Sequence, residues 1–311
     1  MRRFSRLALA GVLSLGLVAC QSQQDTPASS ATKALGPADT VSRSVADLRR
    51  GDLAAVVQAA LPPAHYERVK NEWKDKTKAQ PSTEEDKKEF ADMMAKLTAP
   101  DAEAKLYAEL EPHIAKAEAE MGAQLPLMVG MGRGFAVQAI NESTKLTEAQ
   151  KQQATQMLDA VAKWVESAKF FDREKAKAAL GVAVATARKL ELQTLEQLEA
   201  LEFEQMLQKG GQVWLGFSEI LAVYGLNLDA ALASVKTEVL SQQGNEAKVK
   251  VSYTLFDTPL SFETEMVERD GRWYGKDALA QLDKELAAPA APAAPAEGPE
   301  AADSEGEAAK N

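Results

Sequence analysis

The chain has 311 residues, 36 of them Lys or Arg and 46 Asp or Glu, and its formal net charge at pH 7 is −10. Phosphate binding needs clustered positive charge, so this balance argues against nucleic acid or an anionic lipid surface as a partner. After the N-terminal residues, no apolar run reaches the roughly 18–20 uncharged residues of a membrane-spanning helix. The part from Val41 to Leu286 is long enough for a substantial core, in one large domain or two small ones.

The first 19 residues have the features of a secretory signal peptide. Three arginines precede an uncharged run that ends at Val18 and is too short to span a bilayer. The residues around the predicted cleavage point resemble the lipobox of bacterial lipoprotein precursors: Leu17, Val18, Ala19 and Cys20. The alternatives are an ordinary secretory signal followed by a free thiol, or an N-terminal membrane helix.

The lipoprotein resemblance implies that the sulfur of Cys20 carries a diacylglyceryl group and that its new amine is acylated after cleavage. Each buried methylene contributes about 0.8 kcal/mol, so two or more chains give stable attachment. Cys20 is also the only cysteine, which excludes an internal disulfide in the mature chain. By the same resemblance, Gln21 in place of Asp favours the outer membrane of a Gram-negative bacterium, and a Gram-positive surface is the alternative.

Composition divides the chain into five segments. Cleavage would leave 33 basic and 46 acidic residues, a net charge of −13. Both flanks are too poor in apolar residues to build a core. The predicted segments are the signal peptide 1–19, a disordered tether 20–40, a helical region 41–232, a β-meander 233–286 with a terminal helix, packed on the helical region, and a disordered Ala/Pro/acidic tail 287–311.

The first half of the globular part has helical periodicity. Apolar residues keep helical spacing from Val41 to about Leu61, where Pro62-Pro63 stops the run. Ser82 and Glu85 form a capping-box pattern that predicts a further helix. Pro100-Asp101 predicts the start of another helix, with a kink at Pro112.

The second half continues this pattern up to residue 224. Thr147 and Thr194 each begin a capping-box pattern, and Asp172 can cap the alanine-rich helix between them. Gly210-Gly211 is a C-cap signal, so we expect a helix to end there. A separate apolar helix is then expected from Val213 to Tyr224.

The periodicity changes to two after residue 233, which predicts strands. Val249 to Leu255 and Leu260 to Met266 alternate apolar and polar residues across an expected turn at Asp257-Thr258-Pro259. The turn signal at Gln243-Gly244-Asn245 predicts a strand before it, from Ser234 to Ser241. The turn signal at Asp270-Gly271 predicts a further strand after it. The predicted class is α+β and mainly helical, with a C-terminal antiparallel meander of three to four strands.

The closing strands carry a second resemblance. Asp270-Gly271-Arg272-Trp273-Tyr274 looks like the end of nuclear-transport-factor-two-like domains in bacterial lipoproteins, which often open with a Gly-Asp helix, as Arg50-Gly51-Asp52-Leu53 does. The match covers Val41–Trp73 and Ser234–Lys276, with some 150 mainly helical residues between them. Either these helices are an insertion or the likeness is local hairpin chemistry, and we favour the second interpretation.

The stretches that could serve catalysis, phosphate binding or metal binding are more typical of simpler structural roles. The Gly-rich stretch from Val129 to Gly134 lacks the spacing of a phosphate loop and favours close helix packing or a bend. His65 and His113 have no paired metal-ligand spacing and are interpreted as surface or boundary residues. Glu263 and Glu265 share a strand face, which is more typical of a polar sheet surface than of paired-carboxylate chemistry.

Aromatic residues concentrate in the last third of the sequence. They are more typical of a core, but a cleft between the last helix and the meander would be the default ligand site. The residues proposed to line it are Trp214, Phe217, Tyr224, Tyr253 and Trp273. We therefore expect a non-catalytic envelope lipoprotein on the periplasmic face, with no cofactor, metal or nucleic acid. Its expected partners are the membrane, through acyl chains on Cys20, and envelope proteins. The alternative is a small-ligand binder or an enzyme that uses this cleft.

Overall fold

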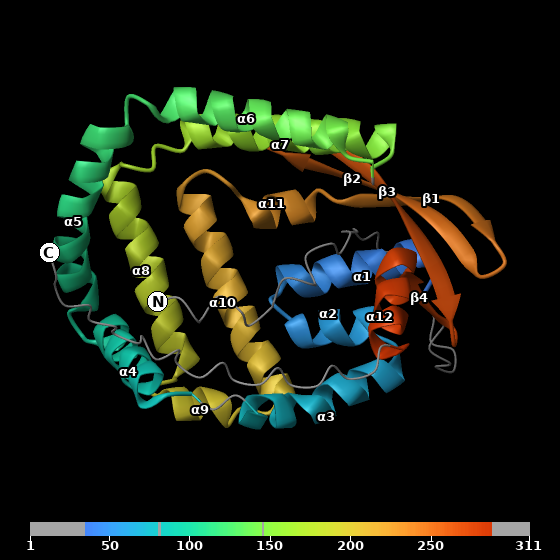
Figure 1. The fold of residues 1–311 in the computed structure, drawn as a ribbon, viewed down its shortest axis with the longest axis horizontal. Coiled ribbons are helices and arrows are strands. Elements are labelled where there is room, and N and C mark those ends of the chain that lie inside the picture. Colours follow the sequence, from blue (N-terminus) through green and yellow to red (C-terminus); the bar gives the residue numbers. More distant parts are fainter. Residues whose placement is uncertain (1–34, 80–81, 145, 288–311) are drawn as a thin grey trace, which may run out of the picture.

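The computed structural model describes residues 35–79, 82–144 and 146–287 and is mainly helical (Figure 1). The predicted signal peptide, Cys20 and the predicted tail 287–311 apart from Ala287 lie outside the described residues, whereas the last four residues of the predicted tether 20–40 belong to the first helix. The elements are α1 Pro37–Arg49, α2 Leu53–Ala60, α3 Pro63–Ala79, α4 Glu84–Thr98, α5 Ala102–Met121, α6 Leu125–Glu142, α7 Glu148–Ser167, α8 Arg173–Leu190, α9 Leu195–Glu199, α10 Phe203–Val223, α11 Leu228–Ala233, β1 Lys236–Gln243, β2 Glu246–Leu255, β3 Thr258–Arg269, β4 Arg272–Gly275 and α12 Lys276–Ala287.

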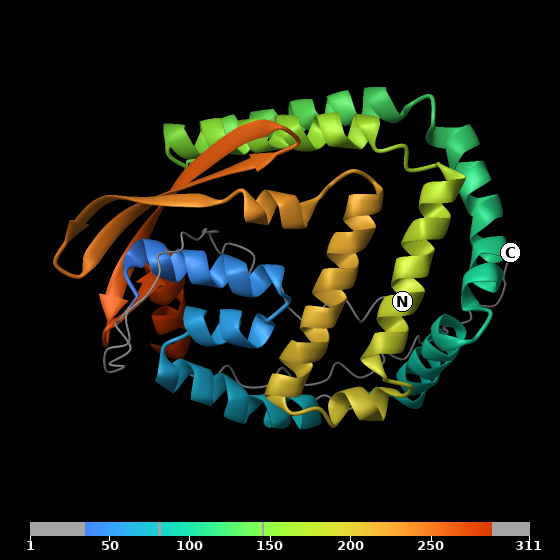
Figure 2. The same cartoon turned by 180° about the vertical axis from the view of Figure 1, so that it is seen from behind.

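The predicted fold class is confirmed. Helices are followed by a four-stranded antiparallel sheet in the order β1-β2-β3-β4, and α12 follows the last strand. In Figures 1 and 2 the peripheral helices run in the order α3, α9, α4, α5, α6 and α7, while α8 and α10 lie side by side within this frame. The sheet lies at the end where α1 and α12 pack, so the two ends of the described chain meet there.

Local capping sets most helix starts. Thr147 and Thr194 form the predicted capping boxes of α7 and α9, and the side chain of Asp172 accepts from the backbone at the start of α8. The capping box predicted for α4 was wrong by one residue. Thr83 forms the box with Asp86, and the Ser82 hydroxyl instead donates to Glu199.

Two-residue turns set the sheet register. Asp270 and Gly271 both have positive φ (54° and 74°), as the predicted tight hairpin requires. The preceding turn was misplaced. Phe256 and Asp257 are the left-handed residues, and Pro259 lies inside β3, paired with Thr254. Similarly, β1 begins at Lys236 because Ser234 is the C-cap of α11, a helix that the periodicity did not predict.

The main core lies between α1 and one face of the sheet. Val41 and Val45 of α1 pack with Val249, Val251 and the other members of this cluster, which are Leu232, Val235, Ala247, Met266 and Trp273. Asp47 is buried at the edge of the same helix, and its carboxylate accepts from Arg43 at 3.2 Å and from Arg50. This burial fixes the end of α1 that leads to the site described below.

A close glycine contact joins the first two helices to α10. The predicted helix from Val41 to Leu61 is interrupted at Gly51, whose φ is +70°. A Cβ on Gly211 would lie 1.8 Å from the carbonyl oxygen of Gly51, so only glycine permits this approach. The prediction that Gly210-Gly211 ends a helix was wrong. The pair lies inside α10, where it lets the α1–α2 turn pack against the helix backbone.

The same helix packs closely against α8. A Cβ on Gly216 would lie 2.1 Å from Oγ1 of Thr186, so α10 carries a second tight contact on its other side. A separate cluster of Met94, Ala187 and Leu192 joins α4, α8 and the segment before α9. Helix α10 thus links the sheet-bearing core to the helical frame.

Candidate functional site

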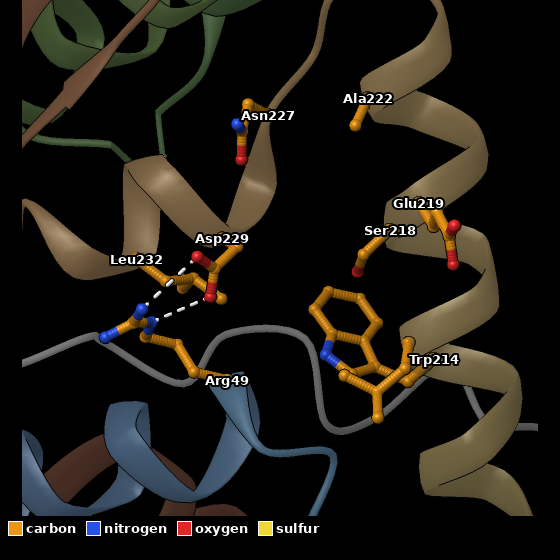
Figure 3. A pocket seen from close by; sticks show the side chains of 9 residues that line it. Arg49, Trp214, Ser218, Glu219, Ala222, Asn227, Asp229 and Leu232 are labelled. Carbon is orange, nitrogen blue, oxygen red and sulfur yellow. Dashed lines mark hydrogen bonds and ion pairs between the residues drawn. The ribbon is translucent and has the colours of Figure 1, made fainter.

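An open hollow of about 290 Å³ lies between α10 and α11, beside the end of α1 (Figure 3). Its lining residues come from three separate parts of the sequence: Arg49, Trp214, Leu215, Ser218, Glu219, Ala222, Asn227, Asp229 and Leu232. Pockets of roughly 300–1,000 Å³ that are largely apolar with a few polar groups are typical binding sites. The hollow is slightly smaller than the lower limit of this range.

Its polar rim is an ion pair between distant elements. Nε of Arg49 lies 2.9 Å from Oδ1 of Asp229, and the second guanidinium nitrogen lies 3.2 Å from Oδ2 (Figure 3). Asn227 caps α11 by accepting from the backbone nitrogen of Ala230 at 2.8 Å, which fixes the turn that presents Asp229. The two charges therefore face each other and hold the α1 end against α11.

The wall opposite the ion pair is formed by α10. Trp214 and Ser218, one helical turn apart, point from α10 into the hollow (Figure 3). The indole nitrogen of Trp214 donates to the carbonyl oxygen of Leu48 at 2.9 Å, which locks the ring in place. Oγ of Ser218 is buried without a hydrogen-bond partner. This wall offers an apolar ring surface and one hydroxyl to an incoming group.

The structure separates the five aromatic residues proposed to form a cleft. Trp214 lines the hollow, and the half-exposed Phe217 lies next to it with ring centroids 6.4 Å apart. Trp273 belongs to the buried core, and Tyr253 packs between this core and a second apolar cluster. Burial raises the pKa of the Tyr253 hydroxyl. These two side chains are therefore structural rather than part of the hollow.

Tyr224 belongs to a different aromatic group at the end of α10. Its ring lies 5.4 Å from that of Phe170, and its carbonyl oxygen accepts from the indole of Trp164 at 2.8 Å. Burial is the main cause that raises the pKa of the Tyr224 hydroxyl, and the negative charge of Asp172 raises it further. Tyr224 thus fastens α10 to α7 and the segment before α8.

The other sequence candidates lie apart from the hollow. The Gly-rich stretch lies within α6, and a Cβ on Gly130, Gly132 or Gly134 would meet no atom within 4 Å, so these glycines support no close packing within the described chain. His113 is exposed on α5. Glu263 pairs with Lys248 at 2.8 Å, and Glu265 with Lys276 at 3.4 Å, as on an ordinary polar sheet surface.

His65 lies at a contact between α3 and α12. Its Nε2 is 3.6 Å from Oδ1 of Asp283, which also accepts from Arg269. Across residues 35–79, 82–144 and 146–287, no group of three or more His, Cys, Asp or Glu is placed to hold a metal. Within the same ranges, no helix has the length and apolar character needed to cross a bilayer.

Sequence reasoning found Trp214 but missed most of the hollow. Arg49 and Asp229 are 180 residues apart, and no local pattern connects them. The capping potential of Asn227 was the one signal that could have placed α11 and thereby Asp229. Comparisons of the chain with protein-family models, curated proteins and solved structures give no match.

Proposed function

We propose that this protein is a lipid-anchored envelope lipoprotein, attached through Cys20 to the periplasmic face of a Gram-negative outer membrane, and that its domain binds a partner without catalysis. The anchor is supported by the lipobox-like residues up to Cys20, which lie outside the described residues. Binding as the role of the domain is supported by the hollow between α10 and α11.

The observation that carries the binding role is the chemistry of this hollow. An indole held by Leu48 provides a rigid apolar surface, and the Arg49–Asp229 pair forms its rim. Aromatic side chains beside an arginine are typical of the central residues of protein interfaces. An apolar side chain of an envelope partner would cover the ring of Trp214 and remain next to the ion pair.

The anchor is tested by Cys20→Ser. We expect the variant to lose incorporation of labelled palmitate and to leave the membrane fraction. Normal attachment of the variant to membranes would contradict the anchor and leave the hollow untouched.

The binding role is tested by filling the hollow. Ala222→Trp adds an indole to its lining, and Gln208→Trp adds the same group to an exposed position of α10 outside the lining. Affinity capture of each lipoprotein from membranes should yield a protein that Ala222→Trp loses and that Gln208→Trp retains. Identical captures by the two variants would refute the role of the hollow.

A small amphipathic ligand is the second candidate, because its apolar part would cover Trp214 and its polar group would supply the hydrogen-bond partner that the buried Oγ of Ser218 lacks. A nitroxide-labelled fatty acid should then quench part of the tryptophan fluorescence. The quenched part should be absent from Trp214→Phe and from Ala222→Trp, and quenching that is the same in all three chains would exclude this ligand.

A further inference from the structure

Helix α6 presents an uncovered apolar face. Leu127 and Phe135 are 67% and 68% exposed, and Met128 and Met131 are also exposed. With 3.6 residues per turn, these four side chains fall within about 100° of the helix circumference. No residue of α6 is buried, and its packing neighbour is α7. In both views α6 forms the outer edge of the molecule (Figures 1 and 2).

The charge of this helix differs from that of the rest of the chain. No acidic residue lies between Glu120 and Glu142, in a chain with 46 Asp and Glu. Arg133 is the one charged residue in that stretch, and its Nε is bound to Asp159 of α7 at 2.6 Å. The face formed by Leu127, Met128, Met131 and Phe135, here called the α6 face, is therefore apolar and locally free of negative charge.

We propose that the α6 face docks on the lipid surface to which Cys20 anchors the chain. The proposal rests on the lipid anchor proposed above and adds a second point of membrane contact. Amphipathic helices can lie in the interfacial plane of a bilayer, with their apolar side chains in the boundary of the acyl chains and without crossing it. The acidic balance of the chain argues against attraction to an anionic lipid surface by charge, but contact through apolar side chains does not depend on such attraction.

The segment between the proposed anchor and the domain is long compared with α6. The segment from Cys20 to Pro37, where α1 begins, spans about 55–60 Å at full extension. Helix α6 has 18 residues and is therefore about 27 Å long. Once the chain is anchored, the α6 face acts at a high effective concentration near the bilayer, so a weak intrinsic affinity is sufficient.

A second copy of the chain fits the α6 face less well. One helix about 27 Å long and 10–12 Å wide offers on the order of 300 Å² per copy. A stable protein interface buries about 800 Å² per partner. The face is too small for a stable dimer by itself but sufficient for a tethered contact with lipid.

The test uses a nitroxide on the full acylated chain. Because Cys20 is the only native cysteine and its sulfur would carry the diacylglyceryl group, Met131→Cys provides the single thiol for labelling. Val213→Cys on α10 is the matched control, since Val213 is similarly exposed (48% against 55% for Met131). Both chains are reconstituted in vesicles of phosphatidylethanolamine with a minor fraction of phosphatidylglycerol.

We expect the nitroxide at position 131 to collide severalfold more often with oxygen, which dissolves in lipid, than the nitroxide at position 213. We expect it to collide severalfold less often with a water-soluble nickel complex. Adding Leu127→Gln and Phe135→Gln should return position 131 to the values of the control. Equal accessibility at the two positions would overturn the proposal. Spin–spin broadening at position 131 without vesicles would overturn it in favour of a second copy.

A second arm of the experiment tests the docking of the α6 face independently of the proposed lipid anchor. Cys20→Ser with a hexahistidine tag before residue 21 is bound to nickel-chelating lipid in the same vesicles, which replaces the acyl chains. Protection of position 131 in this form supports the α6 face even if Cys20 proves not to be acylated. Absence of palmitate labelling from the chain that keeps Cys20 therefore overturns the anchor alone, and exposure of position 131 in both arms overturns the docking.

Discussion

Glycine has opposite structural consequences at two places in this chain. In α10, Gly211 lies so close to the α1–α2 turn that an added Cβ would be 1.8 Å from the backbone oxygen of Gly51. In α6, an added Cβ on Gly132 would meet no atom within 4 Å. Because a backbone atom cannot move aside as a side chain can, the first site requires glycine and the second does not.

We therefore expect the same substitution to act with opposite sign at the two sites. Gly211→Ala should lower the free energy of unfolding by about 2–4 kcal/mol, because α10 must move away from Gly51. Gly132→Ala should raise it by about 0.5–1 kcal/mol, the usual advantage of alanine inside a helix. Urea unfolding followed by circular dichroism measures both. Equal effects of the two changes would show that the Gly51–Gly211 contact does not contribute to stability.

At the scale of elements, the last described helix, α12, is fastened by one side-chain cluster. Arg269 of β3 donates twice to Asp283 of α12, at 3.0 and 2.6 Å, and His65 of α3 lies beside them. The guanidinium of Arg269 is the main cause that lowers the pKa of Asp283. This cluster holds α12 between the sheet and α3.

The attachment of α12 should depend on pH. A carboxyl group with a lowered pKa in the folded state contributes its stability above the ordinary Asp value of about 3.9, and this contribution is lost as the pH falls through the lower folded value. The difference in free energy of unfolding between the wild type and Asp283→Asn should therefore be constant near neutral pH and shrink below about pH 4. Guanidinium titrations at a series of pH values measure it. A difference that stays unchanged down to pH 3 would contradict the role of this pair.

The success of sequence reasoning at this scale followed the range of the interactions. Thr147 and Thr194 bond to backbone within their own first turn, so their helices were located correctly. The role of Gly210-Gly211 depends on Gly51, which is far away in the sequence, and local pattern suggested a helix end. The hollow was missed for the same reason, since Arg49 and Asp229 meet only after α11 has formed.

At the scale of the whole molecule, two of the apolar clusters lie on opposite sides of one helix, α10. The sheet-bearing core contains Val249 of β2, and the core of the frame contains Met94 of α4 and Ala187 of α8. Helix α10 contacts the α1–α2 turn through Gly211 and α8 through Gly216. Helix α10 therefore packs against the sheet-bearing core through Trp214 and against α8, which carries Ala187 of the frame core.

This linkage predicts that the described domain unfolds as one cooperative unit. Val249→Ala creates a cavity at a fully buried site and should cost about 2 kcal/mol. If the two cores are coupled, native-state hydrogen exchange should show the same loss of protection free energy for amides of β2 and for amides of α8, which lies outside the mutated core. The exposed Val213→Ala should change neither by more than about 0.5 kcal/mol. A loss confined to β2 would show that the frame and the sheet-bearing core unfold separately, and that α10 fixes their geometry without coupling their stability.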